Sequence, residues 1–390
     1  MRENMEFLHR TWVEIDLDRI EHNYRQLADR VGGDCRVMCV IKANAYGHGA
    51  VETARLLEAA GCGWFAVSNI EEAQQLRRGG IGARILILGA TPAEYAAALA
   101  EGEITQALYD PDYARELSAA ASAAGVRVCV HLKLDTGMRR IGFDAETQVE
   151  EAAAACCLPG LDAEGVFTHF ATADGDGDPD GSFTRLQFDR FVAAVQALEA
   201  KGVTFRLRHC SNSAAAVTRP DFRLDMVREG IILYGLAPSA AVGAEGFLPA
   251  MSMKARVSMV KEVAAGEGIS YGLTYRTERP MKVATLPVGY ADGYLRAYGK
   301  GCVLLKGECA PILGRVCMDQ MIVDVTGLDV REGDTATLFG EDAGVLLPVE
   351  ALSKLADTIN YETVCAIGRR VPRVYLRGGQ AVGVSGLLDE

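Results

Sequence analysis

The chain has 390 residues, of which 49% are hydrophobic and 24% are charged, and its formal net charge is −12. This composition is ordinary for a globular protein with a large core, and the length favours two or three domains. The acidic balance argues against nucleic acid as a partner, because phosphate backbones bind to basic surfaces. The opening MRENMEFLHRTWVEIDL has no apolar signal region and no later run is long enough to span a membrane, so we expect a cytoplasmic protein without membrane association.

The eleven cysteines show neither a CxxC motif nor a short disulfide framework, which also favours a cytoplasmic protein. We predict that the adjacent pair Cys156 and Cys157, and the closely spaced Cys35 and Cys39, are buried apolar residues rather than metal or redox sites.

From about residue 11 to 240, short β-branched runs alternate with Ala-, Leu- and Glu-rich segments that have helical spacing and end at glycines. Eight strands in alternation with helices predict a (β/α)8 barrel, with a doubly wound open sheet as the alternative. The predicted strands are 38–41, 64–68, 83–89, 104–109, 127–134, 161–170, 205–211 and 226–235. The clearest predicted helices are 51–61, 70–80, 111–125 and 182–202.

Beyond residue 240 the segments become short and strand-like, and turn signals such as GEG, KGE and REGD separate them. This pattern predicts a mostly β second domain with short helices near 348–357 and 358–367. We therefore expect a barrel domain over residues 12–240 and a second domain over 241–390, which also includes residues 1–11.

The loop DGDGDPDG at 174–181 resembles the start of a calcium-binding EF-hand loop, with Asp176, Asp178, Asp180 and Gly181 in matching positions. The twelfth position from Asp176 is Gln187, where an EF-hand needs a bidentate glutamate. We therefore predict a solvated surface loop and no metal site.

Polar residues that are unusual in a buried sheet follow the predicted strands. Because barrel active sites form at the C-terminal ends of the strands, we expect these side chains to converge on one rim. They are Lys42 after the first strand, Lys133, Asp135 and Arg140 after the fifth, His169 at the end of the sixth, His209, Asn212 and Ser213 after the seventh, and Arg228 and Gly230 in the eighth.

Lys42 ends an apolar strand, where a lysine is costly to bury, so we interpret it as a reactive amine. Ser213 fits an ordinary helix N-cap and equally a phosphate site that includes the amides of Gly230 and Ile231. A lysine beside a phosphate site predicts a pyridoxal phosphate Schiff base, or a Schiff-base aldolase acting on a sugar phosphate, and the residues alone leave both open.

The ordered motifs along the whole chain resemble the alanine racemases, beginning with VIKANAYGHG at 40–49, the pyridoxal phosphate signature of that family. The others are HLKLDTGMRRIG (131–142), FTHFATAD (167–174), HCSNSAA (209–215), VREGIILYG (227–235), ISYGLTY (269–275), LPVGYADG (286–293), GRVCMDQ (314–320) and INYE (359–362). The resemblance implies a fold-type III homodimer with shared active sites. It also implies pyridoxal 5'-phosphate as cofactor and a two-base racemisation of alanine that supplies D-alanine for peptidoglycan.

The family's residue roles carry over position by position. Lys42 would hold the cofactor and act as one base, and Tyr271 of the partner subunit would be the opposite base. Arg228 would bind the pyridine nitrogen, with His169 beside it. The resemblance places Tyr46, Ser213, Gly230, Ile231 and Tyr361 at the phosphate, and Arg140, Met318, Asp319 and Tyr290 at the substrate. Arg140 would also reach the phenolic oxygen of the cofactor, and Lys133 matches a lysine that is carbamylated in many relatives.

Three rivals differ at particular residues. A serine or broad-specificity racemase is disfavoured because Tyr361 matches the bulky residue of the alanine-specific members. A decarboxylase of the same fold type needs a glutamate near the pyridine nitrogen, where this chain has Arg228. A non-catalytic pyridoxal phosphate-binding protein is a barrel alone and lacks the second domain.

Overall fold

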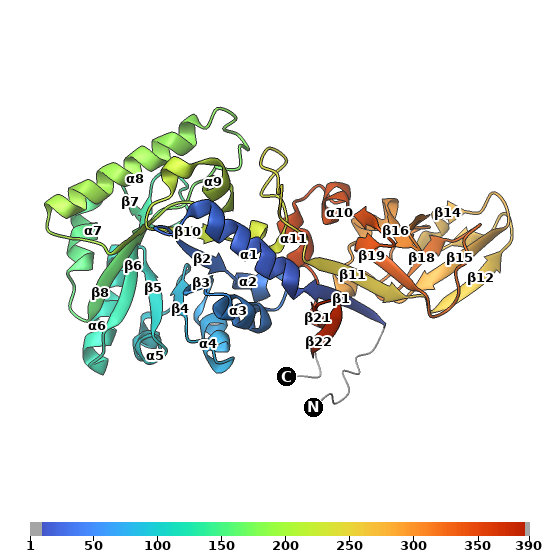
Figure 1. Ribbon diagram of the computed structural model, residues 1–390, viewed down its shortest axis with the longest axis horizontal. Coiled ribbons are helices and arrows are strands. Elements are labelled where there is room, and N and C mark those ends of the chain that lie inside the picture. The colour runs from blue at the N-terminus through green and yellow to red at the C-terminus, as the bar shows by residue number, and fades with distance from the viewer. Residues whose placement is uncertain (1–9, 387–390) are drawn as a thin grey trace. The chain divides into compact units, whose positions relative to one another are not determined.

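The computed structural model describes residues 10–386, which divide into two compact units (Figure 1). The barrel unit comprises residues 20–45 and 50–248, and the second unit comprises residues 10–19, 46–49 and 249–386. Each unit is described by itself below.

The barrel unit is built on eight parallel strands. In sheet order they run β10, β2, β3, β4, β5, β6, β8 and β9, and β10 pairs with β2. Between β9 and β10 the amide of Arg228 donates to Ser211 O (3.0 Å) and that of Asp225 to Arg208 O (3.1 Å), which nearly closes the barrel. The barrel prediction is confirmed and the open sheet is excluded. The strands are β2 Arg36–Val40, β3 Trp64–Val67, β4 Arg84–Ile87, β5 Ile104–Leu108, β6 Val128–Asp135, β8 Leu161–Phe167, β9 Leu207–His209 and β10 Met226–Glu229; the short β7 Phe143–Asp144 pairs with β6.

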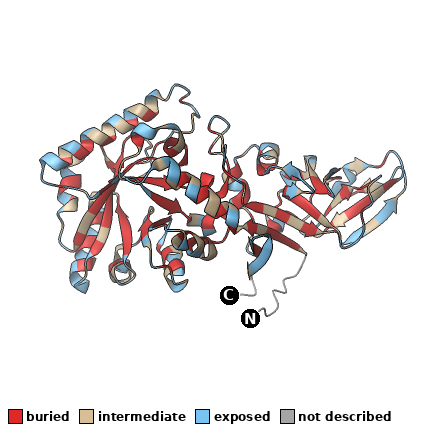
Figure 2. Cartoon of the chain, in the orientation of Figure 1, coloured by how far each residue is buried: buried red, intermediate tan, exposed pale blue. Residues whose placement is uncertain are grey.

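Helices surround these strands, with buried residues on the sides that face the sheet (Figure 2). Local chemistry fixes their ends: the Asn69 side chain caps α4, and α6 runs from Asp110 at its N-cap to Gly125 in the left-handed region at φ 66°. The helices are α1 Leu17–Val31, α3 Ala50–Ala59, α4 Ile70–Arg78, α5 Ala96–Glu101, α6 Pro111–Ala124, α7 Val149–Cys156, α8 Ser182–Ala200 and α9 Ser213–Thr218.

Two expected strands are shorter than predicted. The sixth ends at Phe167 and the eighth at Glu229, after which residues 231–234 form the 3-10 turn η3. The polar residues His169 and Gly230 therefore lie just beyond the strand ends.

The second unit is mostly β, as predicted. Its largest sheet has the order β17, β16, β19, β11, β1, β21, β22, with β20 on β19. Strand β1, Thr11–Asp16, pairs with β11 and β21, so the N-terminal part of this unit extends beyond residue 11. The other strands are β11 Met251–Arg256, β12 Met259–Val263, β13 Gly268–Ile269, β14 Tyr275–Arg276, β15 Met281–Leu286, β16 Cys302–Leu305, β17 Glu308–Pro311, β18 Met321–Asp324, β19 Thr335–Asp342, β20 Val345–Leu347, β21 Arg373–Arg377 and β22 Gln380–Ser385; the helices are α10 Val349–Leu355 and α11 Asn360–Cys365.

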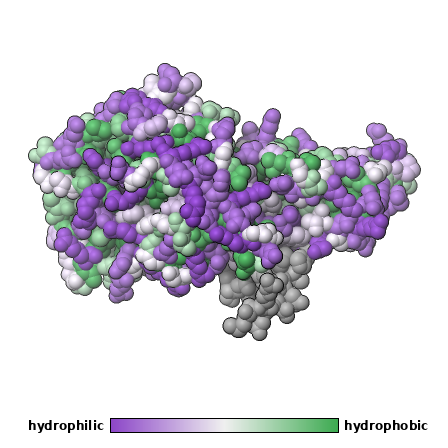
Figure 3. Space-filling model, in the orientation of Figure 1, coloured by the Kyte–Doolittle hydropathy of each residue, from purple (hydrophilic) through white to green (hydrophobic). Residues whose placement is uncertain are grey.

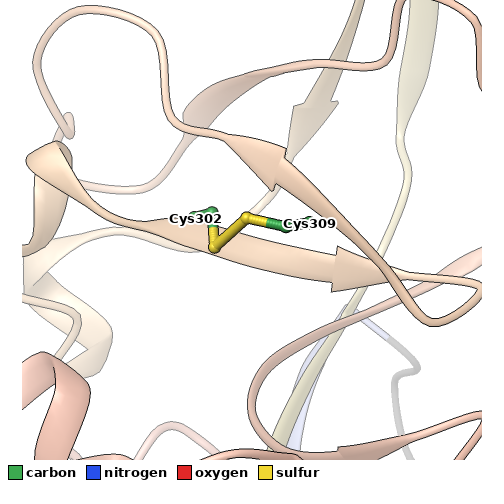
Figure 4. The surroundings of a disulfide bond; sticks show 2 residues. All are labelled: Cys302 and Cys309. Atoms are coloured by element: carbon green, nitrogen blue, oxygen red, sulfur yellow. A yellow bond between two sulfur atoms is a disulfide. The ribbon is translucent and has the colours of Figure 1, made fainter. Parts of the chain in front are cut away.

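The cysteines differ in part from their prediction. Cys39 is buried, but Cys35 and Cys156 are partly exposed and Cys157 is exposed. Cys302 and Cys309 form a disulfide across the β16–β17 hairpin, with 5.9 Å between their Cα atoms (Figure 4). A hairpin register creates this pairing, so the linear spacing of the two cysteines gave no sign of it.

The molecular face drawn in Figure 3 is mainly hydrophilic, with hydrophobic residues interspersed. In residues 10–386 no helix combines the length and apolarity needed to cross a membrane.

The acidic loop at 174–181 has a structural role that the sequence prediction missed. Asp178 turns inward and is 5% exposed. Its carboxylate accepts from the amides of Phe183 (3.0 Å) and Thr184 (2.9 Å) and from the Thr172 and Thr184 hydroxyls. Burial raises its pKa, but these hydrogen bonds outweigh burial and lower it to about 2. Asp178 therefore fixes the start of α8. Within the described residues no His, Cys, Asp and Glu cluster could hold a metal ion.

Replacing Asp178 with Ala should lower the free energy of unfolding by about 1–2 kcal/mol, because the amides at the start of α8 lose their acceptor. Urea unfolding followed by circular dichroism measures the change. Asp176→Ala, in the exposed part of the same loop, is the matched control and should change the value by less than about 0.5 kcal/mol. Equal losses in the two variants would contradict the capping role.

Candidate active site

Lys42 stands at the C-terminal end of β2, at the start of a short helical turn, α2 Lys42–Tyr46. This turn is left-handed: Ala43, Asn44 and Ala45 have φ values of 52–54° and ψ values of 48–49°. A left-handed turn costs roughly 1–2 kcal/mol for each L-residue, so this segment is strained. The small side chains that follow Lys42 in VIKANAYGHG therefore suit this left-handed backbone, which positions the Lys42 amine.

Hydrogen bonds from within the barrel unit hold the turn in place. The Glu72 carboxylate, on α4, accepts from the amides of Ala43 (2.7 Å) and Ser68 (2.8 Å). The Asn44 side chain accepts from the amide of Ala50 (2.8 Å). The strain beside the candidate amine is thus offset by contacts from the next helix along the chain.

Arg228 lies inside the barrel and is 3% exposed. Its guanidinium joins the ends of three strands, donating to Thr168 O (2.8 Å), Cys210 O (3.0 Å), His169 Nδ1 (3.0 Å) and His209 Nδ1 (2.9 Å). Burial lowers its pKa to about 10, so the group stays charged at neutral pH. The four groups that accept hydrogen bonds from Arg228 are all neutral, and none of them is a carboxylate.

The two histidines beside Arg228 are neutral. Burial and the Arg228 charge hold the pKa of both His169 and His209 well below the usual value. Because arginine can only donate, His209 Nδ1 must accept, and its Nε2–H then donates to His131 Nδ1 at 2.9 Å. His131 in turn carries its proton on Nε2, which lies 3.6 Å from Glu164 Oε1.

Glu164 lies at the far end of this series of hydrogen-bonded histidines. Its buried carboxylate accepts from Arg84 (2.6 and 2.7 Å) and Arg206 (3.1 Å). Burial raises its pKa, but His131 and the arginines outweigh burial and lower it to about 2. Gly165 leaves room for the histidine, since a Cβ there would lie 2.6 Å from His131 Nε2.

Ser213 and Gly230 meet just beyond β9 and β10, where the Gly230 amide donates to Ser213 Oγ at 2.8 Å. Both are buried, and Ile231 begins the following turn. Together they form a compact group of a hydroxyl and backbone amides.

Lys133 is 4% exposed and donates to Leu134 O (2.7 Å), while the exposed Arg140 lies in the loop after β6. Burial lowers the pKa of Lys133 to about 7, although Asp135 acts in the opposite direction. The amine is therefore about half neutral at pH 7.

The remaining predicted site residues belong to the second unit, where four lie on neighbouring loops. Tyr271 is 70% exposed, and the adjacent Ser270 donates to Arg315 O (2.6 Å). The amides of Tyr290 and Ala291 donate to Cys317 O and Met318 O, both at 3.1 Å. The exposed Asp319 accepts from Arg370 (2.6 Å), which also donates to the buried Asp292 (2.8 Å).

Tyr46 and Tyr361 lie together elsewhere in this unit, with ring centroids 6.1 Å apart. Burial, with a smaller effect from Tyr361, raises the pKa of Tyr46, so its hydroxyl keeps its proton.

Sequence reasoning missed the residues that support this site, chiefly Glu72, His131, Glu164 and Arg370. One signal was available: His131 and Lys133 are two apart in one strand and therefore share a face. Glu72 and Arg370 act across long sequence separations, which no local pattern reveals.

A barrel with a lysine on its rim and a charged arginine inside, joined to a mostly β unit, defines a two-domain barrel enzyme. The family described as alanine racemase, N-terminal domain, matches residues 15–238, and the corresponding C-terminal domain matches residues 250–375. The alanine racemase of Desulforamulus reducens is 48% identical over 370 residues, covering 94% of this chain and 98% of that protein. The chain belongs to the alanine racemase family.

Solved structures agree. The alanine racemase of Clostridium difficile superposes with a TM-score of 0.92 at 40% identity, covering 98% of this chain and 99% of that one. The alanine racemase of Bacillus anthracis, solved with bound L-Ala-P, gives a TM-score of 0.94 at 34% identity, with coverage of 98% and 99%.

Replacing Glu164 with Gln should lower the free energy of unfolding by about 2–3 kcal/mol at pH 7, because charged hydrogen bonds to the buried carboxylate are lost. The folded-state pKa is depressed, so this contribution is present above about pH 4.5 and falls as the pH drops toward 2. Denaturant unfolding of both proteins between pH 7 and pH 2 measures it.

Asp162→Asn is the matched control, since Asp162 lies two residues earlier, more exposed and 3.3 Å from Arg206. It should change stability by less than about 0.5 kcal/mol. A Glu164→Gln penalty that grew as the pH fell below 4.5 would contradict the assigned ionisation.

Proposed function

We propose that this protein is a pyridoxal 5'-phosphate-dependent racemase that interconverts L- and D-alanine and supplies D-alanine for peptidoglycan. The observation that carries the proposal is Lys42, held by a strained turn at the rim of a barrel whose interior contains the buried, charged Arg228. Membership of the alanine racemase family supports this activity.

The barrel unit has donors of the kinds this cofactor needs. Lys42 would bind it covalently, and Ser213 with the Gly230 and Ile231 amides would hold its phosphate. Among the described residues no acceptor lies within hydrogen-bond distance of Arg228 Nε, so that N–H is available to a pyridine nitrogen. Because a guanidinium can only donate, a pyridine nitrogen bound there would accept the hydrogen bond and would stay unprotonated. When bound, the cofactor makes the α-proton of an amino acid acidic.

Racemisation needs a proton removed from one face and returned on the other. We assign these roles to Lys42 and to Tyr271 of the partner subunit. His169, kept neutral beside Arg228, orients the arginine and can accept or relay a hydrogen bond without adding charge. A tyrosine that acts as a base needs such a network of hydrogen bonds around it.

The second unit's surface supports a homodimer with shared sites. Tyr271 (70%), Leu273 (53%), Met318 (52%) and Ile359 (61%) are exposed large hydrophobic residues, and such residues at a functional surface are typical of an interface. In the dimer, the Met318 amide, Asp319 and Tyr290 would meet the substrate carboxylate beside Arg140 of the other chain. Tyr46 and Tyr361 would contribute to the phosphate site.

We place the enzyme in the cytoplasm, and we propose that its two domains correspond to the two compact units. These differ from 12–240 and 241–390 plus 1–11 because β1 and residues 46–49 belong to the second unit and residues 241–248 to the barrel unit. Nine of the eleven cysteines are free thiols, which fits a reducing compartment.

The proposal is tested by turnover of L-alanine, L-serine and other small amino acids, with chirality-resolved product analysis. The purified protein should be yellow, lose its colour with borohydride and racemise L-alanine without added cofactor. Tyr361 favours alanine over serine. A yellow protein that turns over none of the panel would support a non-catalytic binder, and a preference for L-serine would support a serine racemase.

Replacing Tyr271 with Phe should reduce turnover from L-alanine by about 10²- to 10⁴-fold, because one of two proton-transfer groups is lost. The visible absorption should remain, since Lys42 is unchanged. Tyr95→Phe, at another exposed tyrosine, is the control and should keep full activity. Full activity in the Tyr271 variant would refute the two-base assignment.

Lys133 should react with carbon dioxide, because the lowered pKa leaves a neutral amine at pH 7. The nitrogen lone pair bonds the carbon, one N–H proton leaves to solvent, and a carbamate anion remains near Arg140. Carbon-13 NMR in labelled bicarbonate should show a carbamate signal that Lys133→Met abolishes and that replacement of the exposed Lys261 leaves intact. A signal unchanged by Lys133→Met would exclude the modification.

A further inference from the structure

Glu229 is a fully buried carboxyl group with no assigned role. It is 0% exposed, and neither of its carboxyl oxygens has a hydrogen-bond partner among the described residues. A buried carboxyl without partners is costly and marks a site where a missing interaction is expected.

The carboxyl lies outside the barrel interior. Side chains alternate along β10, so Glu229 points away from the face that carries Arg228. For the same reason Glu229, although it is next to Arg228 in the sequence, cannot take the place of Arg228 as the group that would bind the pyridine nitrogen. The groups that act on it from its own side of the strand are the Ser213 hydroxyl, the charge of Arg223, and the Cys35 and Cys39 thiols of the neighbouring β2 segment. Arg228, on the opposite face, acts on it through its charge alone.

Ser213 connects Glu229 to the phosphate group proposed above. The serine oxygen accepts from the Gly230 amide at 2.8 Å, and Gly230 directly follows Glu229. A hydroxyl has two lone pairs and one proton. One lone pair of Ser213 Oγ accepts the bond from the Gly230 amide. The hydroxyl can therefore accept one more hydrogen bond and donate its own proton to another group.

We propose that Glu229 is a positioning residue for the cofactor phosphate: its protonated carboxyl donates to Ser213 Oγ, which then directs its own O–H to the phosphate. This inference rests on the proposed function and extends it to a residue beyond the phosphate group itself. It gives the buried carboxyl O–H an acceptor and uses every hydrogen-bonding position of the serine.

The electrostatics fit a neutral carboxyl. Burial raises the pKa of Glu229 to about 8, although Ser213, Arg223 and Arg228 act in the opposite direction. Burial also raises the pKa of Cys35 to about 11 and that of Cys39 well above its usual value, so both thiols are neutral near pH 8. Above pH 8 an ionised Glu229 would repel the phosphate and could no longer donate to Ser213.

The test compares binding of pyridoxal phosphate to the full-length apoprotein of the wild type, Glu229→Gln and Glu229→Leu at pH 7 and pH 9. The amide of Glu229→Gln can donate at both pH values, so this variant should bind as tightly as the wild type at pH 7. At pH 9 about one carboxyl in ten is protonated, so the wild type should weaken about tenfold relative to Glu229→Gln. Glu229→Leu, neutral but unable to donate, should bind about tenfold more weakly than Glu229→Gln at both pH values.

Asp225→Asn is the matched control, because Asp225 lies just before β10 and pairs with Arg208; it should keep the wild-type pH profile. Lysine–cofactor chemistry also depends on pH, but it is common to all variants and cancels in the ratios. Identical profiles for the wild type, Glu229→Gln and Glu229→Leu would overturn this inference alone. A folded wild type that binds no pyridoxal phosphate would instead overturn the proposed function.

A second measurement tests the ionisation of the buried Glu229 carboxyl in the protein without cofactor. The pKa of Glu229 is higher in the folded protein than in the unfolded chain. The free energy of unfolding therefore falls as the pH rises from the pKa of the unfolded chain toward 8. Apo Glu229→Gln should therefore melt at a higher temperature than the wild type at pH 8, with a smaller difference at pH 5. A difference that did not depend on pH would contradict a protonated Glu229.

Discussion

The interior of the barrel is organised around one buried cation. Arg228 donates and cannot accept, so every group that touches it must offer a lone pair. Backbone carbonyls at the ends of β8 and β9 and two neutral imidazoles meet that requirement. The same bonds tie together strand ends on both sides of the gap in the ladder between β9 and β10. Arg228 therefore both holds the ends of β9 and β10 together and fixes the tautomers of the histidines that it contacts.

The cation also sets the charge of its surroundings. The amine of Lys133 and the imidazoles of His169 and His209 lose basicity through burial, and the nearby Arg228 adds to the effect. The nearby carboxylates are Asp135, which acts on Lys133, and Glu164 at the outer end of the histidine chain, which is paired with Arg84 and Arg206. The charges of Arg228, Arg140, Lys133 and Lys42 all act on His169, and this concentration of positive charge suits ligands that carry carboxylate or phosphate groups.

The sequence predicted the barrel because its strand–helix alternation is local and repeated eight times. It also predicted the lysine, arginine and serine of the rim, since each is unusual where it stands. It could not predict Glu72 under the Lys42 turn or Glu164 beneath the histidines, because surface-type carboxylates acquire these roles only through tertiary contacts. The Cys302–Cys309 bond and the inward turn of Asp178 were missed for the same reason: register and loop conformation decide them.

The left-handed turn after β2 imposes an order on the maturation of the enzyme. The turn is unfavourable by itself, and the carboxylate that holds its first amide lies 29 residues further along the chain, on α4. A chain emerging from the ribosome therefore cannot present Lys42 in its final orientation until β3 and α4 have packed. The orientation of the Lys42 amine is therefore a product of tertiary packing in the first quarter of the barrel and not of its own segment alone.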